Sequence, residues 1–132
     1  MAQSHEDLLA AAEAEVTSID VAEAAPLRAD PGTVFVDIRD VRELERDGMI
    51  PGARHAPRGM LEFWISASSP YHKPWLAEDK TYIFYCASGW RSLLAAQVAQ
   101  KMGVRSMSLR GGYSGWKTSG QETATREPKP GL

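Results

Sequence analysis

The only cysteine of the chain, Cys86, begins the segment Cys-Ala-Ser-Gly-Trp-Arg-Ser, between a short apolar run and a stretch with the pattern of an amphipathic helix. A chain that leaves a strand and turns into a helix directs successive backbone N–H groups into one concavity, and the helix N-terminus adds partial positive charge. These amides, together with Arg91, favour the thiolate form of a cysteine at the mouth of the concavity. The segment therefore predicts a nucleophilic Cys86, and Gly89 is the residue able to adopt a positive φ in such a loop.

The residues after Cys86 offer further groups to the same space. Ser92 also qualifies as the N-terminal cap of the following helix. The Trp90 indole is expected either at the rim of the loop, where it would meet an acceptor, or packed on the aromatic residues of segment 61–75. A lone cysteine after an apolar strand is commonly a buried structural thiol, and the spacing of Cys, Gly, Arg and Ser favours the functional interpretation instead. The predicted loop and substrate-binding positions are Ala87, Ser88, Gly89, Trp90, Arg91 and Ser92.

Alternating strands and helices must hold this loop in place. The segments 33–38 and 79–86 contain apolar runs that face both ways, as in buried parallel strands. Apolar residues four apart predict a helix over 91–102, and Gly103 stands where a left-handed C-terminal cap belongs. The fold class is therefore α/β: a small parallel sheet of about five strands with helices on both faces. Ligands of such sheets bind at the carboxyl ends of the strands, where Cys86 falls.

The chain divides into a helical extension at residues 1–15, a single domain at 16–118 and a polar tail at 119–132. The tail is expected to be unordered or loosely docked. The glycine-rich segment 110–116 is expected to make a tight turn, with Trp116 packed into the core.

Asp37 and Arg39 end a buried strand on the same side of the sheet as Cys86 if the two strands are parallel. They are candidates for shaping the pocket, and the alternative is a structural ion pair that fixes the following turn. Arg39 and Glu43 are also spaced to pair within a helix, which would contribute only a few tenths of a kcal/mol.

Composition narrows the function classes. The chain has 132 residues with 43% hydrophobic and 24% charged, as an ordinary globular protein has, and its net charge of -2 with scattered basic residues disfavours nucleic acid as a partner. One cysteine excludes an intramolecular disulfide, and His5, His55 and His72 are too scattered to propose a metal site or a Cys–His pair. No signal peptide or membrane-spanning run is present, so we expect a cytoplasmic protein without membrane partners, and its oligomeric state stays open.

Three segments carry a resemblance to a known family. "CASGWRS" resembles the active-site loop of the rhodanese family, Cys-x-x-Gly-x-Arg-Ser. "VDIRDVRELERDGMIPGARHAP" resembles its Asp-x-Arg strand end and its Gly-His-Ile-Pro-Gly-Ala segment, with Met49 in the position of the histidine, and "LRGGYSGW" resembles its closing glycine signature. The resemblance covers residues 16–118. It implies a rhodanese-like fold, a Cys86 that carries a transferable sulfur as a persulfide, and no metal or organic cofactor.

The resemblance further implies a sulfurtransferase that takes sulfane sulfur from a donor such as thiosulfate. The acceptor would be cyanide in an assay and a small or protein thiol in the cell. Four residues separate Cys86 from Arg91, as in rhodanese-like sulfurtransferases, whereas related cysteine phosphatases and arsenate reductases have five. The tighter loop suits one sulfur atom better than a phosphoryl group.

Two alternatives remain. The domain could be a non-enzymatic binding or sulfide-sensing module, although an intact Cys86 and loop favour an enzyme. Redox or arsenate chemistry is disfavoured by the loop length and by the lack of a resolving cysteine.

Overall fold

Within residues 2–128, which the computed structural model describes, five parallel strands form one sheet in the order β1-β5-β4-β2-β3. β4 and its neighbours β5 and β2 occupy the middle of the sheet, and β1 and β3 form its edges. The predicted parallel sheet of about five strands is confirmed. The strand bounds are β1 (Thr17–Ile19), β2 (Thr33–Asp37), β3 (Arg54–His55), β4 (Thr81–Tyr85) and β5 (Ser106–Leu109).

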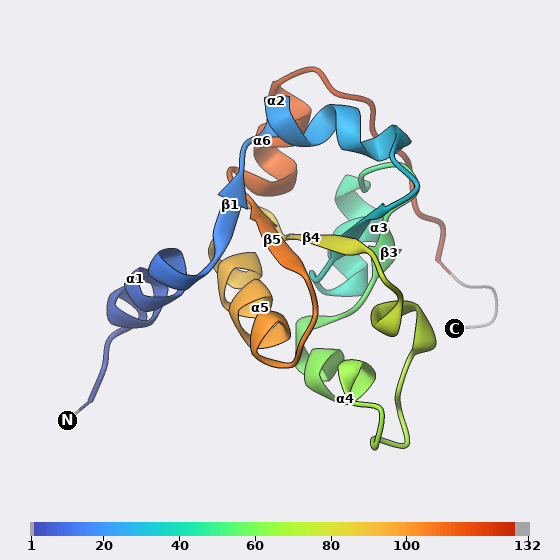
Figure 1. The fold of residues 1–132 in the computed structure, drawn as a ribbon. Coiled ribbons are helices and arrows are strands. Elements are labelled where there is room, and N and C mark those ends of the chain that lie inside the picture. The colour runs from blue at the N-terminus through green and yellow to red at the C-terminus, as the bar shows by residue number, and fades with distance from the viewer. Residues whose placement is uncertain (1, 129–132) are drawn as a thin grey trace.

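Helices cover both faces of the sheet, as predicted. Helices α1, α4 and α5 lie on one face, and α2 and α6 lie on the other (Figure 1). The α-helices are α1 (His5–Glu15), α2 (Val21–Ala24), α3 (Val41–Asp47), α4 (Leu61–Ile65), α5 (Trp90–Lys101) and α6 (Gly112–Thr118), with short 3-10 helices at Ala25–Ala29, Arg58–Met60 and Pro74–Ala77.

Each face of the sheet has its own apolar core, because successive side chains of a strand point to opposite faces. On β4 and at its end, Tyr82, Phe84 and Cys86 join the core under α1, α4 and α5. Ile83 and Tyr85 join the core under α2 and α6. Cys86 therefore projects from the face that α1 and α5 cover.

The central helix begins one residue earlier than predicted. α5 starts at Trp90, and its N-cap is Gly89, with φ +118. The helix ends before Gly103, whose φ of +90 confirms the predicted left-handed position. These two glycines therefore mark both ends of the helix that follows Cys86.

Part of the polar tail is docked on the domain. Ala124 and Met49 exchange two backbone hydrogen bonds of 2.8 Å, and the Trp116 indole N–H donates to the Glu122 carbonyl oxygen at 2.7 Å. Trp116 is fully buried, which confirms its predicted core position. The tail prediction also covers residues 129–132, which lie outside the described residues.

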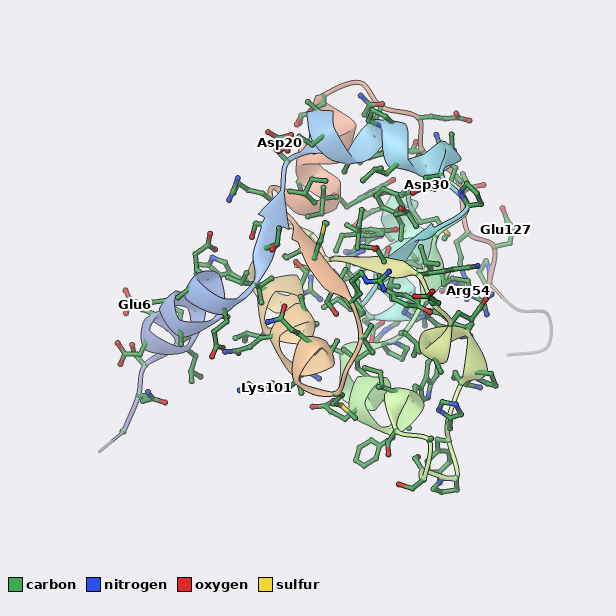
Figure 2. The ribbon with its side chains drawn as sticks, in the orientation of Figure 1. Glu6, Asp20, Asp30, Arg54, Lys101 and Glu127 are labelled. Carbon is green, nitrogen blue, oxygen red and sulfur yellow. The ribbon has the colours of Figure 1, made fainter. Side chains whose placement is uncertain are left out.

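Apart from the buried Asp37 and Arg39, the charged side chains of residues 2–128 are at least partly exposed. Glu6, Asp20, Lys101 and Glu127, which come from distant parts of the chain, all project outward (Figure 2). No helix within residues 2–128 has both the length and the hydrophobicity that crossing a membrane requires.

Candidate active site

Cys86 directly follows β4, and its sulfur faces the loop that leads into α5. The backbone N–H of Gly89 donates to Cys86 Sγ at 3.2 Å. A positive φ at Gly89 directs this N–H back toward the sulfur, and the predicted conformation of this glycine is thus confirmed. The N-terminus of α5 starts at the next residue, so its partial positive charge lies beside Sγ.

A buried pair of hydroxyl groups extends from the sulfur. Cys86 Sγ lies 3.6 Å from Ser92 Oγ, and Ser92 Oγ lies 2.9 Å from Ser108 Oγ on β5. Ser92 also donates to the Gly89 carbonyl oxygen at 3.2 Å. Ser92 therefore lies within α5 and stabilises the loop. The prediction of Ser92 as the N-cap was wrong, because the N-cap is Gly89.

Helix α6 holds the carbonyl groups at the end of β4. The backbone N–H of Tyr113 donates to the Cys86 carbonyl oxygen at 2.8 Å, and that of Ser114 donates to the Ala87 carbonyl oxygen at 3.0 Å. Gly112 makes this approach possible, because a Cβ at its position would lie 2.6 Å and 2.7 Å from the same two oxygens. The glycine-rich segment thus fixes the base of the loop by its own helix N-terminus.

Arg91 pairs with Glu43 of α3 and also lies close enough to interact with Cys86; its hydrogen bonds with Glu43 are the main cause that raises the pKa of its guanidinium. Two hydrogen bonds join the guanidinium to the carboxylate, at 2.9 Å and 3.1 Å. The hydrogen bonds with Arg91 lower the pKa of Glu43, although partial burial opposes the shift. This pairing indicates that Arg91 fastens the loop to α3.

Asp37 and Arg39 form a buried ion pair at the end of β2. Arg39 Nη2 lies 2.7 Å from the Asp37 carboxylate, and the two side chains are 1% and 0% exposed. Arg39 also donates to the Gly48 carbonyl oxygen at 2.8 Å and lies over the Tyr113 ring at 4.5 Å. Burial opposes the charge of Arg39, but the hydrogen bonds and charge of Asp37 outweigh it and raise the pKa of the guanidinium.

These contacts favour the structural interpretation of Asp37 and Arg39, which anchor α6 and the turn before β3. The predicted Arg39–Glu43 pair was wrong, because Arg39 turns inward to Asp37 and Glu43 turns to Arg91. The sequence did not indicate that Glu43 pairs with Arg91, since the two residues are 48 positions apart and no local pattern marks the pair.

Trp90 is 61% exposed at the outer edge of the loop. Its ring lies 5.4 Å from that of His5 rather than on the aromatic residues of segment 61–75. The interpretation of Trp90 as a rim residue therefore fits the structure. His55 is a scaffold contact, with Nε2 at 2.7 Å from the Arg39 carbonyl oxygen.

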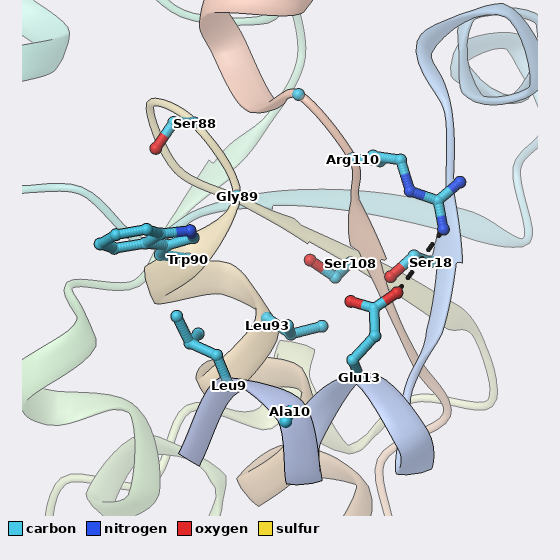
Figure 3. Close-up of a pocket in the computed structure, with 11 residues that line it drawn as sticks. Leu9, Ala10, Glu13, Ser18, Ser88, Gly89, Trp90, Leu93, Ser108 and Arg110 are labelled. Atoms are coloured by element: carbon cyan, nitrogen blue, oxygen red, sulfur yellow. Dashed lines mark ion pairs between the residues drawn. The ribbon is translucent and has the colours of Figure 1, made fainter. Parts of the chain in front are cut away.

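Cys86 is only 1% exposed, so the sulfur lies beneath the loop rather than at its mouth. Ser88 and Trp90, by contrast, are exposed. A cavity of about 360 Å³ opens beside the loop, with Gly89 and Ser108 in its wall (Figure 3). The arrangement can hold a thiolate against a backbone N–H and a helix N-terminus, with a small-molecule cavity adjacent.

Comparisons with known proteins indicate the family of this chain. A family model described as the rhodanese-like domain matches residues 20–119. A Bacillus subtilis protein, YtwF, which is named provisionally as a sulfurtransferase, is 30% identical over 91 residues; these make up 69% of this chain and 80% of that protein.

Solved structures extend the likeness to three dimensions. A Rhodopseudomonas palustris protein of unknown function, described as a possible tyrosine phosphatase, is 43% identical with a TM-score of 0.90, over 93% of this chain and 96% of that one. A thiosulfate sulfurtransferase from Pseudomonas aeruginosa is 26% identical with a TM-score of 0.72, over 92% of this chain but 22% of that one. With a match to residues 20–119 and the fold of these neighbours, the chain belongs to the rhodanese-like domain family.

Proposed function

We propose that this protein is a sulfurtransferase in which Cys86 carries sulfane sulfur as a persulfide. The observation that carries the proposal is the position of Cys86 Sγ, which accepts the Gly89 N–H at 3.2 Å beside the N-terminus of α5. Family membership and relatives named as sulfurtransferases support the same reaction class.

The first half-reaction forms the persulfide. The Cys86 thiolate attacks the outer sulfur of thiosulfate, and the S–S bond of the donor breaks. Sulfite leaves with the bonding electron pair, so that the negative charge stays on the new outer sulfur of Cys86. Backbone N–H groups of the loop would stabilise that charge, and the Arg91–Glu43 ion pair would hold the loop in position.

The second half-reaction regenerates the thiolate. A nucleophilic acceptor, cyanide in an assay and a thiol in the cell, attacks the outer sulfur and displaces Cys86. Because the resting thiol lies beneath the loop, both half-reactions require the exposed residues Ser88 to Trp90 to give way to the reactant. Each cycle begins from the reduced form of Cys86, and this requirement supports a cytoplasmic location.

Intact-mass analysis after incubation with thiosulfate tests the proposal. We expect the mass of one added sulfur atom, removable by a thiol reductant, on the native chain and not on the Cys86→Ser variant. Polysulfide serves as a second donor, because it needs no recognition of a sulfonate group. If neither donor adds sulfur, the enzyme interpretation is wrong and the non-enzymatic binding module takes its place.

The phosphatase description of the Rhodopseudomonas relative calls for a parallel assay. We expect no Cys86-dependent hydrolysis of p-nitrophenyl phosphate, because four rather than five residues separate Cys86 from Arg91 and because Arg91 is held by Glu43. Hydrolysis that disappears in Cys86→Ser would assign the loop to phosphoryl transfer instead.

A further inference from the structure

The cavity beside the loop is built from elements at both ends of the chain. α1 forms one wall, and the ends of β1 and β5, the loop and the start of α5 form the others (Figure 3). Its volume of about 360 Å³ lies in the range of small-molecule sites. Its lining includes Glu13, Ser18, Trp90, Leu93, Ser108 and Arg110.

The cavity lies on the same sheet face as the Cys86 sulfur. Ser108 of β5 is the register partner of Phe84 on β4 and of Ser18 on β1. Cys86 and Arg110 each follow two residues later, directly after the ends of β4 and β5. Cys86 packs in the same core as Phe84, and Arg110 lines the cavity together with Ser108, so both side chains lie on this face. Adjacent strands lie about 4.8 Å apart, which places the Cys86 position next to the cavity wall.

Two groups connect the sulfur to the cavity. Gly89 lines the cavity with its backbone and donates its N–H to Cys86 Sγ. Ser108 lines the cavity with its hydroxyl and reaches the sulfur through Ser92. The sulfur is therefore separated from the cavity by one glycine and one hydroxyl pair.

The lining has an apolar end and a charged end. The Trp90 indole, Leu9 and Leu93 lie on one side in Figure 3, and Glu13, Ser18 and Arg110 lie on the other. The Arg110 guanidinium and the Glu13 carboxylate are 3.7 Å apart, too far for a hydrogen bond, and are 61% and 57% exposed. This loose pair leaves one cation and one anion available to a ligand at the same end of the cavity.

We propose that this cavity binds the sulfur acceptor, and that the acceptor is a small thiol carrying both a carboxylate and an ammonium group. The carboxylate would pair with Arg110, the ammonium with Glu13, and the thiol would point toward Gly89 and Ser108. Ser108 and Arg110 are two residues apart in the sequence and line the same cavity, so one compact ligand such as cysteine would reach both. The Glu13 carboxylate would repel a dianionic acceptor, and the Arg110 guanidinium would repel a cationic acceptor.

This inference rests on the proposed function, since it assigns the acceptor of the Cys86 persulfide. The anionic persulfide first takes up a proton from solvent; the acceptor thiolate then attacks its outer sulfur, a new S–S bond forms, and the bond to Cys86 Sγ breaks. The products are the acceptor persulfide and the Cys86 thiolate, and the acceptor has lost its thiol proton to solvent beforehand. No further oxidant or reductant is required.

The charged end of the cavity includes residues outside the family match. α1, which supplies Glu13, and β1, which supplies Ser18, precede residues 20–119. Acceptor selection would therefore be a property of this chain rather than of the family domain.

A panel of acceptors tests the charge pattern. The protein is loaded with polysulfide, and discharge is measured with cysteine, with cysteamine, which lacks the carboxylate, with 3-mercaptopropionate, which lacks the ammonium, and with cyanide. We expect the lowest KM for cysteine. Arg110→Gln should raise the KM about fivefold for cysteine and 3-mercaptopropionate but not for cysteamine, and Glu13→Gln should raise it about fivefold for cysteine and cysteamine but not for 3-mercaptopropionate.

Cyanide has neither charged group, so its discharge of the persulfide should change far less than the discharge by cysteine in both variants. The matched control is Arg105→Gln, which removes an exposed, ion-paired arginine just before β5 and should leave every KM unchanged. If Arg110→Gln or Glu13→Gln changes all thiols equally, the pair merely positions α1, and the proposal is overturned. No change with any thiol overturns it as well.

Binding can also be measured without sulfur transfer. S-methylcysteine has both charged groups and no free thiol, so it cannot accept sulfur. We expect calorimetry to detect its binding to the native chain and binding about fivefold weaker to Arg110→Gln. Equal binding, or none to the native chain, overturns the acceptor site, whereas failure to form a persulfide overturns the proposed function.

Discussion

Replacing Gly112 with alanine tests how the end of β4 is held. Gly112 has φ +57, and its added Cβ would lie 2.6 Å from the Cys86 carbonyl oxygen and 2.7 Å from that of Ala87. Both contacts are too short to persist, so either α6 or the loop must move. That movement would break the hydrogen bonds that Tyr113 and Ser114 donate to the same two oxygens.

The loss of stability can be worked out from these contacts. An alanine at positive φ costs about 1–2 kcal/mol, overpacking costs about 1–3 kcal/mol, and each lost backbone hydrogen bond costs about 1 kcal/mol. We therefore expect Gly112→Ala to lower the free energy of unfolding by about 4–7 kcal/mol. The matched control is Gly103→Ala, where φ is +90 and nothing lies within 4 Å of the built Cβ. It should cost only about 1–2 kcal/mol.

Urea unfolding of the two variants measures this difference, and alkylation of Cys86 under native conditions measures the local effect. We expect Cys86 to react faster in Gly112→Ala than in Gly103→Ala, because the segment over the sulfur is displaced only in the former. Equal losses of stability, or equal alkylation rates, would refute the account of α6 as the support of the loop.

Three further predictions concern the surroundings of the loop. Glu43→Gln should lower the free energy of unfolding by about 0.5–1 kcal/mol at pH 7. Hydrogen bonding to Arg91 lowers the pKa of Glu43 below its ordinary 4.5, so this stabilisation is complete above pH 4.5 and is lost as the pH falls through the folded-state pKa. The unfolding free energies of the variant and the native chain, measured in urea at several pH values, should converge in acid. A difference between them that stays constant down to pH 3 would contradict the stabilising role of the Glu43–Arg91 pair. Asp37→Asn should cost about 3–5 kcal/mol, because it leaves Arg39 buried without its counter-charge. Asp40→Asn, at an exposed N-cap, should cost much less, and similar losses of the two variants in denaturant unfolding would argue against the buried pair. Trp90→Ala should change the unfolding free energy by less than about 0.5 kcal/mol while weakening S-methylcysteine binding in calorimetry, and a large loss of stability would show that the indole is a packing residue.

The parts of the fold that the sequence predicted depend on local patterns. The apolar runs that became β2 and β4 and the periodic helix ending before Gly103 carry their information within a few residues. The conformation of the loop after Cys86 also depends on neighbouring residues, because Gly89, with its positive φ, directly precedes the first residue of α5. The sequence could therefore indicate both the sheet and the direction from which the helix N-terminus approaches the sulfur.

Contacts between distant segments were not predictable in the same way. The partner of Arg91 could have been any acid, and Glu43 is selected only because α3 follows β2, the strand next to β4. The burial of Cys86 is also a collective result, since it needs α6 on its carbonyl oxygen and α5 on its sulfur at once.

The position of helix α1 depends on residues that are far away in the sequence. Its sequence is rich in alanine, and Ala12 alone is buried within it, so the pattern does not say which surface the helix covers. Its place is fixed from α5, where Gln97 and Gln100 bond to Glu15, and from the end of β5, where Arg110 meets Glu13. The proposed persulfide chemistry would use the loop inside the family match, whereas the charged end of the cavity depends on this helix. A relative that shares residues 20–119 without such a helix is therefore expected to keep cyanide discharge and to lose the preference for an amino-acid thiol.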